Sequence, residues 1–174
     1  LKQSTQQSLR EGDSFFSYQI MSDFVLGNEA PKKLKKDEDY REDINEMQED
    51  VLGYLVDQVG EEENILSNRE FLISKLSTIA TKGKLAEFGM NETAADAVKS
   101  QVDAESMILK HAAIVGLKGI VHKSGEKWED LNESAASAIT DGLGSDNHEF
   151  QRISFLESID LLRKAKVKND GTIL

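Results

Sequence analysis

The sequence predicts an all-α fold, a single-domain bundle of five to seven helices with a mobile N-terminal arm. Apolar residues recur at three- and four-residue steps through most of the chain, which is the spacing of amphipathic helices. Alternation of β-branched and polar residues, typical of a strand, is nearly absent, and Pro31 is the only proline. Hydrophobic residues make up 39% of the 174 residues, which is enough to build a core.

The chain is expected to divide into an arm, one domain and a tail. Residues 1–13 are polar and carry little apolar material, so they are predicted to form a flexible N-terminal arm. The helical domain is predicted over residues 14–168, and residues 169–174 form a short C-terminal tail. The sequence shows no internal repeat and no low-complexity tract.

The first element of the domain is the apolar segment 14–26. Phe16, Ile20 and Phe24 recur at four-residue steps, which predicts a helix that buries them. The same segment also suits an extended strand, and its residues alone leave that choice open. A turn follows before Pro31, because proline disfavours a helical conformation in the residue that precedes it.

A second helix is predicted over residues 37–59. Acidic residues in its first turn favour the positive end of the helix dipole. Its apolar side chains recur at helical spacing and form one stripe, which comprises Tyr40, Ile44, Met47, Val51, Tyr54 and Leu55.

The middle of the chain is predicted to form two more helices. Ser67 and Glu70 have the spacing of a capping box, which opens the first of them. Asn91 is predicted to cap the longest helix, which extends to about Leu117. Residues 120–127 fit either a short hairpin or a loop.

Two helices complete the domain. The first is predicted from Trp128, whose ring is expected to anchor it to the core, to Ile139. Ser145 is expected to cap the last helix, with Asp146 as a competing cap. The inner face of that helix is predicted to comprise Phe150, Ile153, Phe155, Leu156, Ile159 and Leu162.

The net charge of −11 is concentrated in one element. Residues 37–63 hold twelve acids and one base, so the rest of the chain is neutral. Four of these acids share one helical face, and a cluster of four lysines precedes them. We predict that these two patches bind a protein partner or a second copy of the chain, whereas the alternative is a merely solvated surface. The residues are Asp39, Asp43, Glu46 and Asp50, and Lys32, Lys33, Lys35 and Lys36.

The sequence contains none of the motifs that usually carry chemistry. It has no cysteine, and its histidines, His111, His122 and His148, lack the spacing of a metal site. It has no glycine-rich phosphate-binding motif, and no serine stands in a nucleophile elbow. We therefore predict no catalytic residue, no cofactor and no metal.

Composition also bears on location and partners. No apolar run is long enough to span a membrane, and no signal peptide opens the chain, so a cytoplasmic or virion-associated location is predicted. The acidic charge argues against direct binding to nucleic acid or to anionic membranes.

The stretch His111–Leu131 (HAAIVGLKGIVHKSGEKWEDL) and the helix that follows it resemble the later part of bacteriophage tail-assembly chaperones and related small virion assembly proteins. In that family a helix ends in an apolar, glycine and tryptophan-like step, crosses a short Asp/Gly turn and enters another helix. Leu117 stands where an aromatic residue is usual, and Ser124-Gly125 replaces the acidic turn. The resemblance implies a non-enzymatic protein that shields or places apolar segments of a larger assembly.

These observations favour a non-enzymatic helical protein that works through protein–protein interaction or assembly, such as a phage or virion structural or accessory component. Two alternatives stay open. The first is a small helical enzyme or ligand-binding protein whose site is built from scattered residues. The second is an acidic regulatory protein that occupies a basic partner.

Overall fold

The structure, a computed structural model, describes residues 2–27, 38–82, 89–124 and 129–164. These residues form seven α-helices, two short 3-10 helices and no strand, which confirms the predicted all-α fold. The α-helices are α1 (Lys2–Val25), α2 (Glu38–Gly60), α3 (Leu66–Ala80), α4 (Met90–Ser100), α5 (Met107–Ser124), α6 (Glu129–Asp141) and α7 (His148–Lys164). The 3-10 helices are η3 (Gln101–Asp103) and η5 (Gly142–Gly144).

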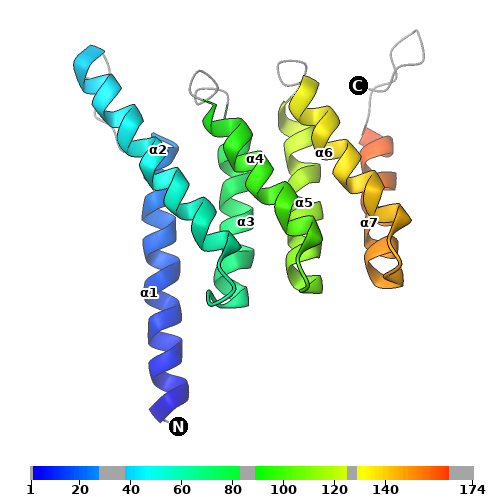
Figure 1. Ribbon diagram of the computed structural model, residues 1–174, viewed down its shortest axis with the longest axis horizontal. Coiled ribbons are helices and arrows are strands. Elements are labelled where there is room, and N and C mark those ends of the chain that lie inside the picture. The colour runs from blue at the N-terminus through cyan, green and yellow to red at the C-terminus, as the bar shows by residue number, and fades with distance from the viewer. Residues whose placement is uncertain (1, 28–37, 83–88, 125–128, 165–174) are drawn as a thin grey trace.

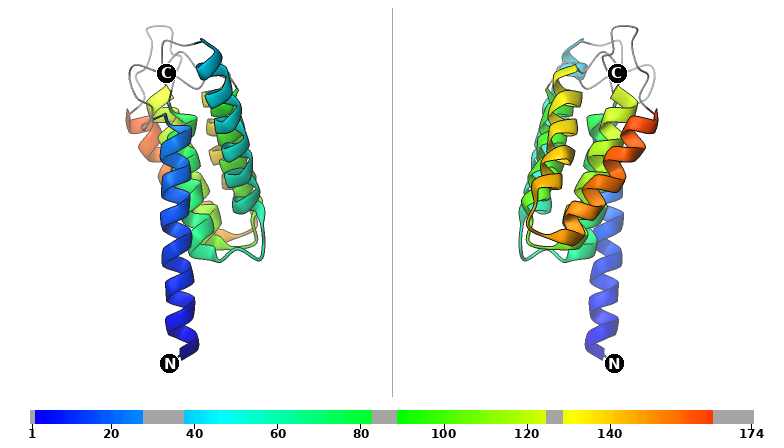
Figure 2. Two further views of the ribbon diagram at one scale, coloured as in Figure 1. Left: turned by 90° about the vertical axis from the view of Figure 1, so that its left-hand side faces the viewer. Right: turned by 90° about the vertical axis from the view of Figure 1, so that its right-hand side faces the viewer.

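The helices form two layers. The helices α1, α3, α5 and α7 lie in one layer and run in the same direction, whereas α2, α4 and α6 form the other layer and run in the opposite direction (Figures 1 and 2). The core lies between the layers and is largely aliphatic, with Leu52, Leu55, Leu72, Leu76, Ile79, Leu109, Ile114, Leu117, Ile120 and Ile139 among its fully buried side chains. Such a row of stacked antiparallel helices has the architecture of an α-solenoid.

A 41-residue repeat underlies this stacking. The helices α3, α5 and α7 begin at residues 66, 107 and 148, and η3 and η5 begin at residues 101 and 142, so equivalent elements lie 41 residues apart. The equivalent side chains of Leu72, Ala113 and Ser154 are all fully buried. The expectation of no internal repeat is therefore wrong. Residue identities conceal the repeat because equivalent positions differ in size and polarity.

The structure settles the open choice for residues 14–26, because α1 is a continuous helix. Residues 2–13, which belong to the predicted arm, form its first turns and project beyond the two layers (Figures 1 and 2). Mobility of this arm stays a prediction.

The predicted buried face of α1 is wrong. Phe16 is 68% exposed and Ile20 is 45% exposed, whereas Tyr18, Ser22 and Val25 are buried. The helix carries apolar residues on two sides, and periodicity alone does not show which side meets the neighbouring helices.

The helix α2 shows the same ambiguity. Leu55 is buried as predicted, together with Leu52 and Val59, but Met47 and Tyr54 are exposed. The true buried stripe lies on one flank of the predicted stripe, because apolar residues cover a broad arc of this helix.

Two predicted caps in the middle of the chain are not formed. The helix α3 begins after Ile65 with no side-chain cap, so the capping box of Ser67 and Glu70 is absent. Asn91 lies inside α4, where its buried Nδ2 contacts the carbonyl oxygens of Ile79, Ala80 and Lys82 at 2.8–3.0 Å. Asn91 thus closes the C-terminal end of α3 instead of opening its own helix.

The long helix predicted after Asn91 is two helices. The helix α4 ends at Ser100, η3 follows, and Ala104 takes a ψ of 148° that ends the helical backbone before α5 begins. Residues 120–124 belong to α5 rather than to a hairpin, and residues 125–128, which include Trp128, lie outside the described residues.

The last helix is capped by Asn147 rather than by Ser145 or Asp146. Asn147 Oδ1 accepts hydrogen bonds from the backbone N–H groups of Glu149 and Phe150, both at 3.0 Å. Phe150 is buried as predicted, but three members of the predicted inner face are exposed, namely Phe155, Leu156 and Leu162.

Polar side chains tie neighbouring helices together. Arg69 on α3 donates to the carbonyl oxygen of Val59 at 2.8 Å and to Gln101 Oε1 at 3.1 Å. Lys118 on α5 forms ion pairs with Glu157 and Asp160 on α7. Burial opposes the charge of Lys118, but its hydrogen bonds to these carboxylates outweigh burial and raise its pKa.

Tyr18 joins α1 to the C-terminal end of α2 and to the turn that follows it. Its hydroxyl donates to Gln58 Oε1 at 3.1 Å and accepts from Asn64 Nδ2 at 3.2 Å. Burial raises the pKa of Tyr18, the hydrogen bond from Asn64 opposes this shift, and the nearby Tyr54 adds to it.

We expect the neutral phenol of Tyr18 to make stability sensitive to alkaline pH. Because its folded pKa is raised, its contribution is complete below about pH 10, the ordinary pKa of tyrosine, and is lost as the pH rises through the folded pKa. The melting temperature should therefore fall less between about pH 9 and about pH 11 in Tyr18→Phe than in the wild type. Tyr54→Phe removes an exposed phenol and only the smallest contribution to the raised pKa of Tyr18, so it should keep most of the wild-type fall. An equal fall in Tyr18→Phe and the wild type would contradict this prediction.

Candidate functional site

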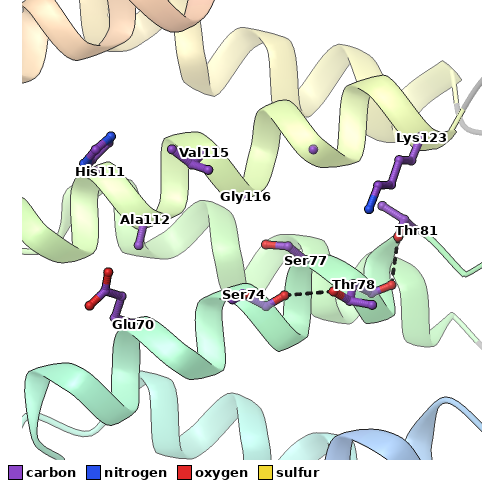
Figure 3. Close-up of a pocket in the computed structure, with 11 residues that line it drawn as sticks. Glu70, Ser74, Ser77, Thr78, Thr81, His111, Ala112, Val115, Gly116 and Lys123 are labelled. Atoms are coloured by element: carbon purple, nitrogen blue, oxygen red, sulfur yellow. Dashed lines mark hydrogen bonds between the residues drawn. The ribbon is translucent and has the colours of Figure 1, made fainter.

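The candidate site is a groove of about 340 Å³ between α3 and α5. The helix α3 contributes Glu70, Ser74, Ser77, Thr78 and Thr81, and α5 contributes His111, Ala112, Val115, Gly116, Gly119 and Lys123 (Figure 3). The lining residues of α3 lie opposite its buried stripe of Leu72, Leu76 and Ile79. The groove therefore opens on the face of its layer that points away from α2, α4 and α6.

The wall formed by α3 is lined by hydroxyl groups. Ser77 Oγ donates to the carbonyl oxygen of Ile73 at 2.7 Å. Thr78 Oγ1 donates to the carbonyl oxygen of Ser74 at 3.1 Å (Figure 3). Thr81 Oγ1 donates to the carbonyl oxygen of Thr78 at 2.9 Å. Each hydroxyl has one proton, which is directed at the backbone of α3, so its oxygen is left to accept hydrogen bonds. This wall suits a ligand that is rich in N–H donors.

Two glycines of α5 shape the opposite wall. A Cβ atom at Gly116 would overlap Ser77 Oγ and lie 3.1 Å from Val98 Cγ1, so the absence of a side chain allows α3 and α5 to approach closely. A Cβ atom at Gly119 would have nothing within 4 Å. Gly116 therefore sets the spacing of the helices, and Gly119 leaves open space in the groove.

Charged side chains stand at both ends of the groove. Glu70 and His111 lie toward one end, and Lys123 lies at the other end beside Thr81 (Figure 3). At a helical rise of about 1.5 Å per residue, the distance along α3 from residue 70 to residue 81 is about 16 Å. An extended polypeptide advances about 3.3 Å per residue, so the groove has the length of about five residues.

The groove brings serine, histidine and glutamate together without connecting them. A serine nucleophile needs a base within hydrogen-bond reach. Among the residues that line the groove, no hydrogen bond or ion pair joins His111 to Ser74 or to Glu70, and the His111 side chain is exposed. The hydroxyls and charged groups of the groove can offer hydrogen bonds and charge to a ligand.

The acids predicted from the sequence lie elsewhere. Asp43, Glu46 and Asp50 are exposed on α2, and Asp39 belongs to the first turn of the same helix. The helix α2 lies in the other layer, apart from the groove (Figure 2). The lysines of the predicted basic cluster, Lys32, Lys33, Lys35 and Lys36, lie outside the described residues. A role of both patches in partner binding stays a prediction.

Histidines do not gather into a metal site in the described part of the chain. His111, His122 and His148 are all exposed, and no group of three or more His, Asp or Glu side chains among those described is placed to hold a metal ion. In the same part of the chain, no helix combines the length and the apolar character needed to cross a bilayer.

Sequence reasoning missed the groove because most of the residues that line it are small and uncharged. Ser74, Thr78 and Thr81 recur at helical spacing on the polar side of α3, and Gly116 and Gly119 interrupt an otherwise apolar helix. A stripe of hydroxyls and two helical glycines were signals available in the sequence. Their convergence depends on the pairing of α3 with α5, which only the structure shows.

Substitutions of three helical glycines test the assigned packing. Gly119→Ala is expected to raise the free energy of unfolding by about 0.5–1 kcal/mol, because alanine favours the helix and the new methyl group meets nothing. Gly116→Ala is expected to lower it by about 1–3 kcal/mol through overpacking against Ser77 and Val98. Chemical denaturation measures both changes. Gly53→Ala, in an open position on α2, is the control and should behave like Gly119→Ala.

A second substitution locates the cause of the loss at Gly116. Replacing Ser77 by alanine in the Gly116→Ala variant removes the overlapping hydroxyl and should recover part of the lost stability. A Gly116→Ala variant as stable as Gly119→Ala would show that α3 and α5 do not approach closely.

No protein-family model, curated protein or solved structure matches this chain. The resemblance of His111–Leu131 to phage tail-assembly chaperones therefore stays a prediction. Within that stretch the structure places residues up to Ser124 in α5 and those from Glu129 in α6.

Proposed function

We propose that this chain is a non-enzymatic helical-repeat protein that binds a short extended segment of a protein partner in the groove between α3 and α5. The observation that carries the proposal is the groove itself, an open channel with hydroxyl acceptors on one wall and glycines on the other. Helical-repeat proteins use extended surfaces of this kind to bind partners.

The chemistry of the groove favours a polypeptide. The oxygens of Ser77, Thr78 and Thr81 can accept from the backbone N–H groups of an extended chain. Glu70 suits a lysine or arginine of the ligand at one end, and Lys123 suits a carboxylate at the other end. A ligand of this class needs no chemical step, which agrees with the lack of a hydrogen-bonded serine and histidine pair in the groove.

The acids of α2 support a second contact with the same partner. Asp43, Glu46 and Asp50 are exposed and carry charge of one sign along one face. Such a face accelerates the encounter with a basic partner, and its attraction for that partner weakens as the salt concentration rises. It favours partners that carry lysines and arginines outside the segment held in the groove.

Selection of binding peptides tests the proposal. A display library of random linear peptides would be selected on the wild-type chain, and the affinity of the enriched peptides measured by titration. In Gly119→Leu the new side chain fills open space in the groove, so these peptides should bind at least roughly tenfold more weakly. We expect the enriched peptides to carry a basic residue, because Glu70 lies at the mouth of the groove.

The control for this selection is Gly53→Leu. It adds the same side chain to a helical glycine that has nothing around it, but on α2 and far from the groove. Gly53→Leu should bind the selected peptides with wild-type affinity. Equal binding by the wild type and Gly119→Leu, or failure to enrich any peptide, would contradict the proposed function.

A further inference from the structure

On α7, the last helix among the described residues, an apolar stripe is exposed. Phe155 is 55% exposed and Leu162 is 58% exposed, and both lie on the side of α7 away from the ion pairs that bind it to α5. Ile159 lies between them on the helix surface and is partly buried. We call Phe155, Ile159 and Leu162 the tail stripe.

The repeat shows what normally covers this stripe. Phe155 is equivalent to Ile73 in α3 and to Ile114 in α5, because these positions lie 41 residues apart. Both isoleucines are 0% exposed, since further helices of the array lie beyond α3 and α5. The tail stripe is therefore a stacking surface of the repeat, and a helix packed like those inside the array would cover it.

The other end of the array carries a matching surface. The helix α1 is the end helix of the same layer as α7 and runs in the same direction (Figure 1). Phe15 packs against Phe71 of α3, whereas Phe16 and Ile20, which lie about 100° and about 140° around α1 from Phe15, are exposed. We call Phe16 and Ile20 the head stripe.

We propose that a second copy of the chain covers the tail stripe with its head stripe, so that copies stack head to tail. The helix α1 of the second copy then follows α7 in one layer, and its α2 follows α6 in the other layer. Each added helix keeps the direction of the layer it joins (Figure 1). The contact joins two different surfaces, so it does not close after two copies and extends the array.

Charge favours the same arrangement. The acidic half of α2, with Asp43 and Glu46 exposed, lies at the same edge of the layers as the C-terminal end of α7 (Figure 1). That end of α7 carries two basic residues, Arg163, which is exposed, and Lys164, the last residue of the helix. Head-to-tail stacking thus places acids of one copy at the same edge as bases of the next.

Variants with one blocked end test the proposal. Phe155→Glu with Leu162→Glu blocks the tail stripe, and Phe16→Glu with Ile20→Glu blocks the head stripe; all four side chains are exposed, so the fold should tolerate the changes. Size-exclusion chromatography with light scattering measures the mass. The wild type should grow beyond a dimer as concentration rises, and each blocked variant alone should stay a monomer.

The equal mixture of the two variants gives the sharpest result. Each variant keeps one working end, so the mixture should form a dimer and nothing larger, and that dimer also shows that both variants are folded. Ile108→Glu, on an exposed position of α5, is the control and should assemble like the wild type.

Three results would overturn the proposal. A wild-type chain that stays monomeric at all concentrations means that nothing covers the tail stripe in this way. A head-blocked variant that still dimerises, with a tail-blocked variant that does not, means that two tail stripes pair symmetrically. A mixture that stays monomeric, while both variants keep their helical circular dichroism, means that the two stripes do not meet.

Discussion

No helix pair of this protein can bury its apolar stripe alone, and the rest of the structure depends on this constraint. The side chains of Leu72 and Ala113, at equivalent positions of α3 and α5, are covered only because a further helix pair stacks beside each of them. Polar contacts also hold neighbouring repeats together, since Arg69 and Lys118 each join elements of two repeats. Stability in such an array is spread over nearest-neighbour contacts and does not reside in one central core.

The surfaces that we assign to function follow from this stacking. The helices α3 and α5 come close at Gly116 and Ser77, which both line the groove, and the same side of the layer carries further hydroxyls and Gly119. The groove is the space between α3 and α5, which approach each other closely at Gly116. The apolar stripes at the two ends arise from the same geometry, because the first and last helices lack one neighbour each within the described residues.

Periodicity was sufficient to predict the helical class and insufficient to predict which face each helix buries. Phe16 and Leu162 were expected in the core because they have helical spacing, and both are exposed since apolar residues occupy two sides of α1 and α7. Asn91 is a residue type that commonly caps a helix, but its side chain bonds to the C-terminal end of the preceding helix α3, and the capping pattern does not reveal that contact. The groove escaped prediction because serine, threonine and glycine carry no signal of their own until two helices are placed side by side.

The central claim is that the two ends of this stack, on α1 and α7, are surfaces for further stacking. Hydrogen–deuterium exchange over a range of protein concentrations tests it. The account predicts that backbone amides of α7 and of the described part of α1 exchange more slowly as the concentration rises. Amides of α3 and α5, which are already covered on both sides, should exchange at a constant rate. Amides of α7 that are protected as strongly as those of α5 at every concentration would contradict the account.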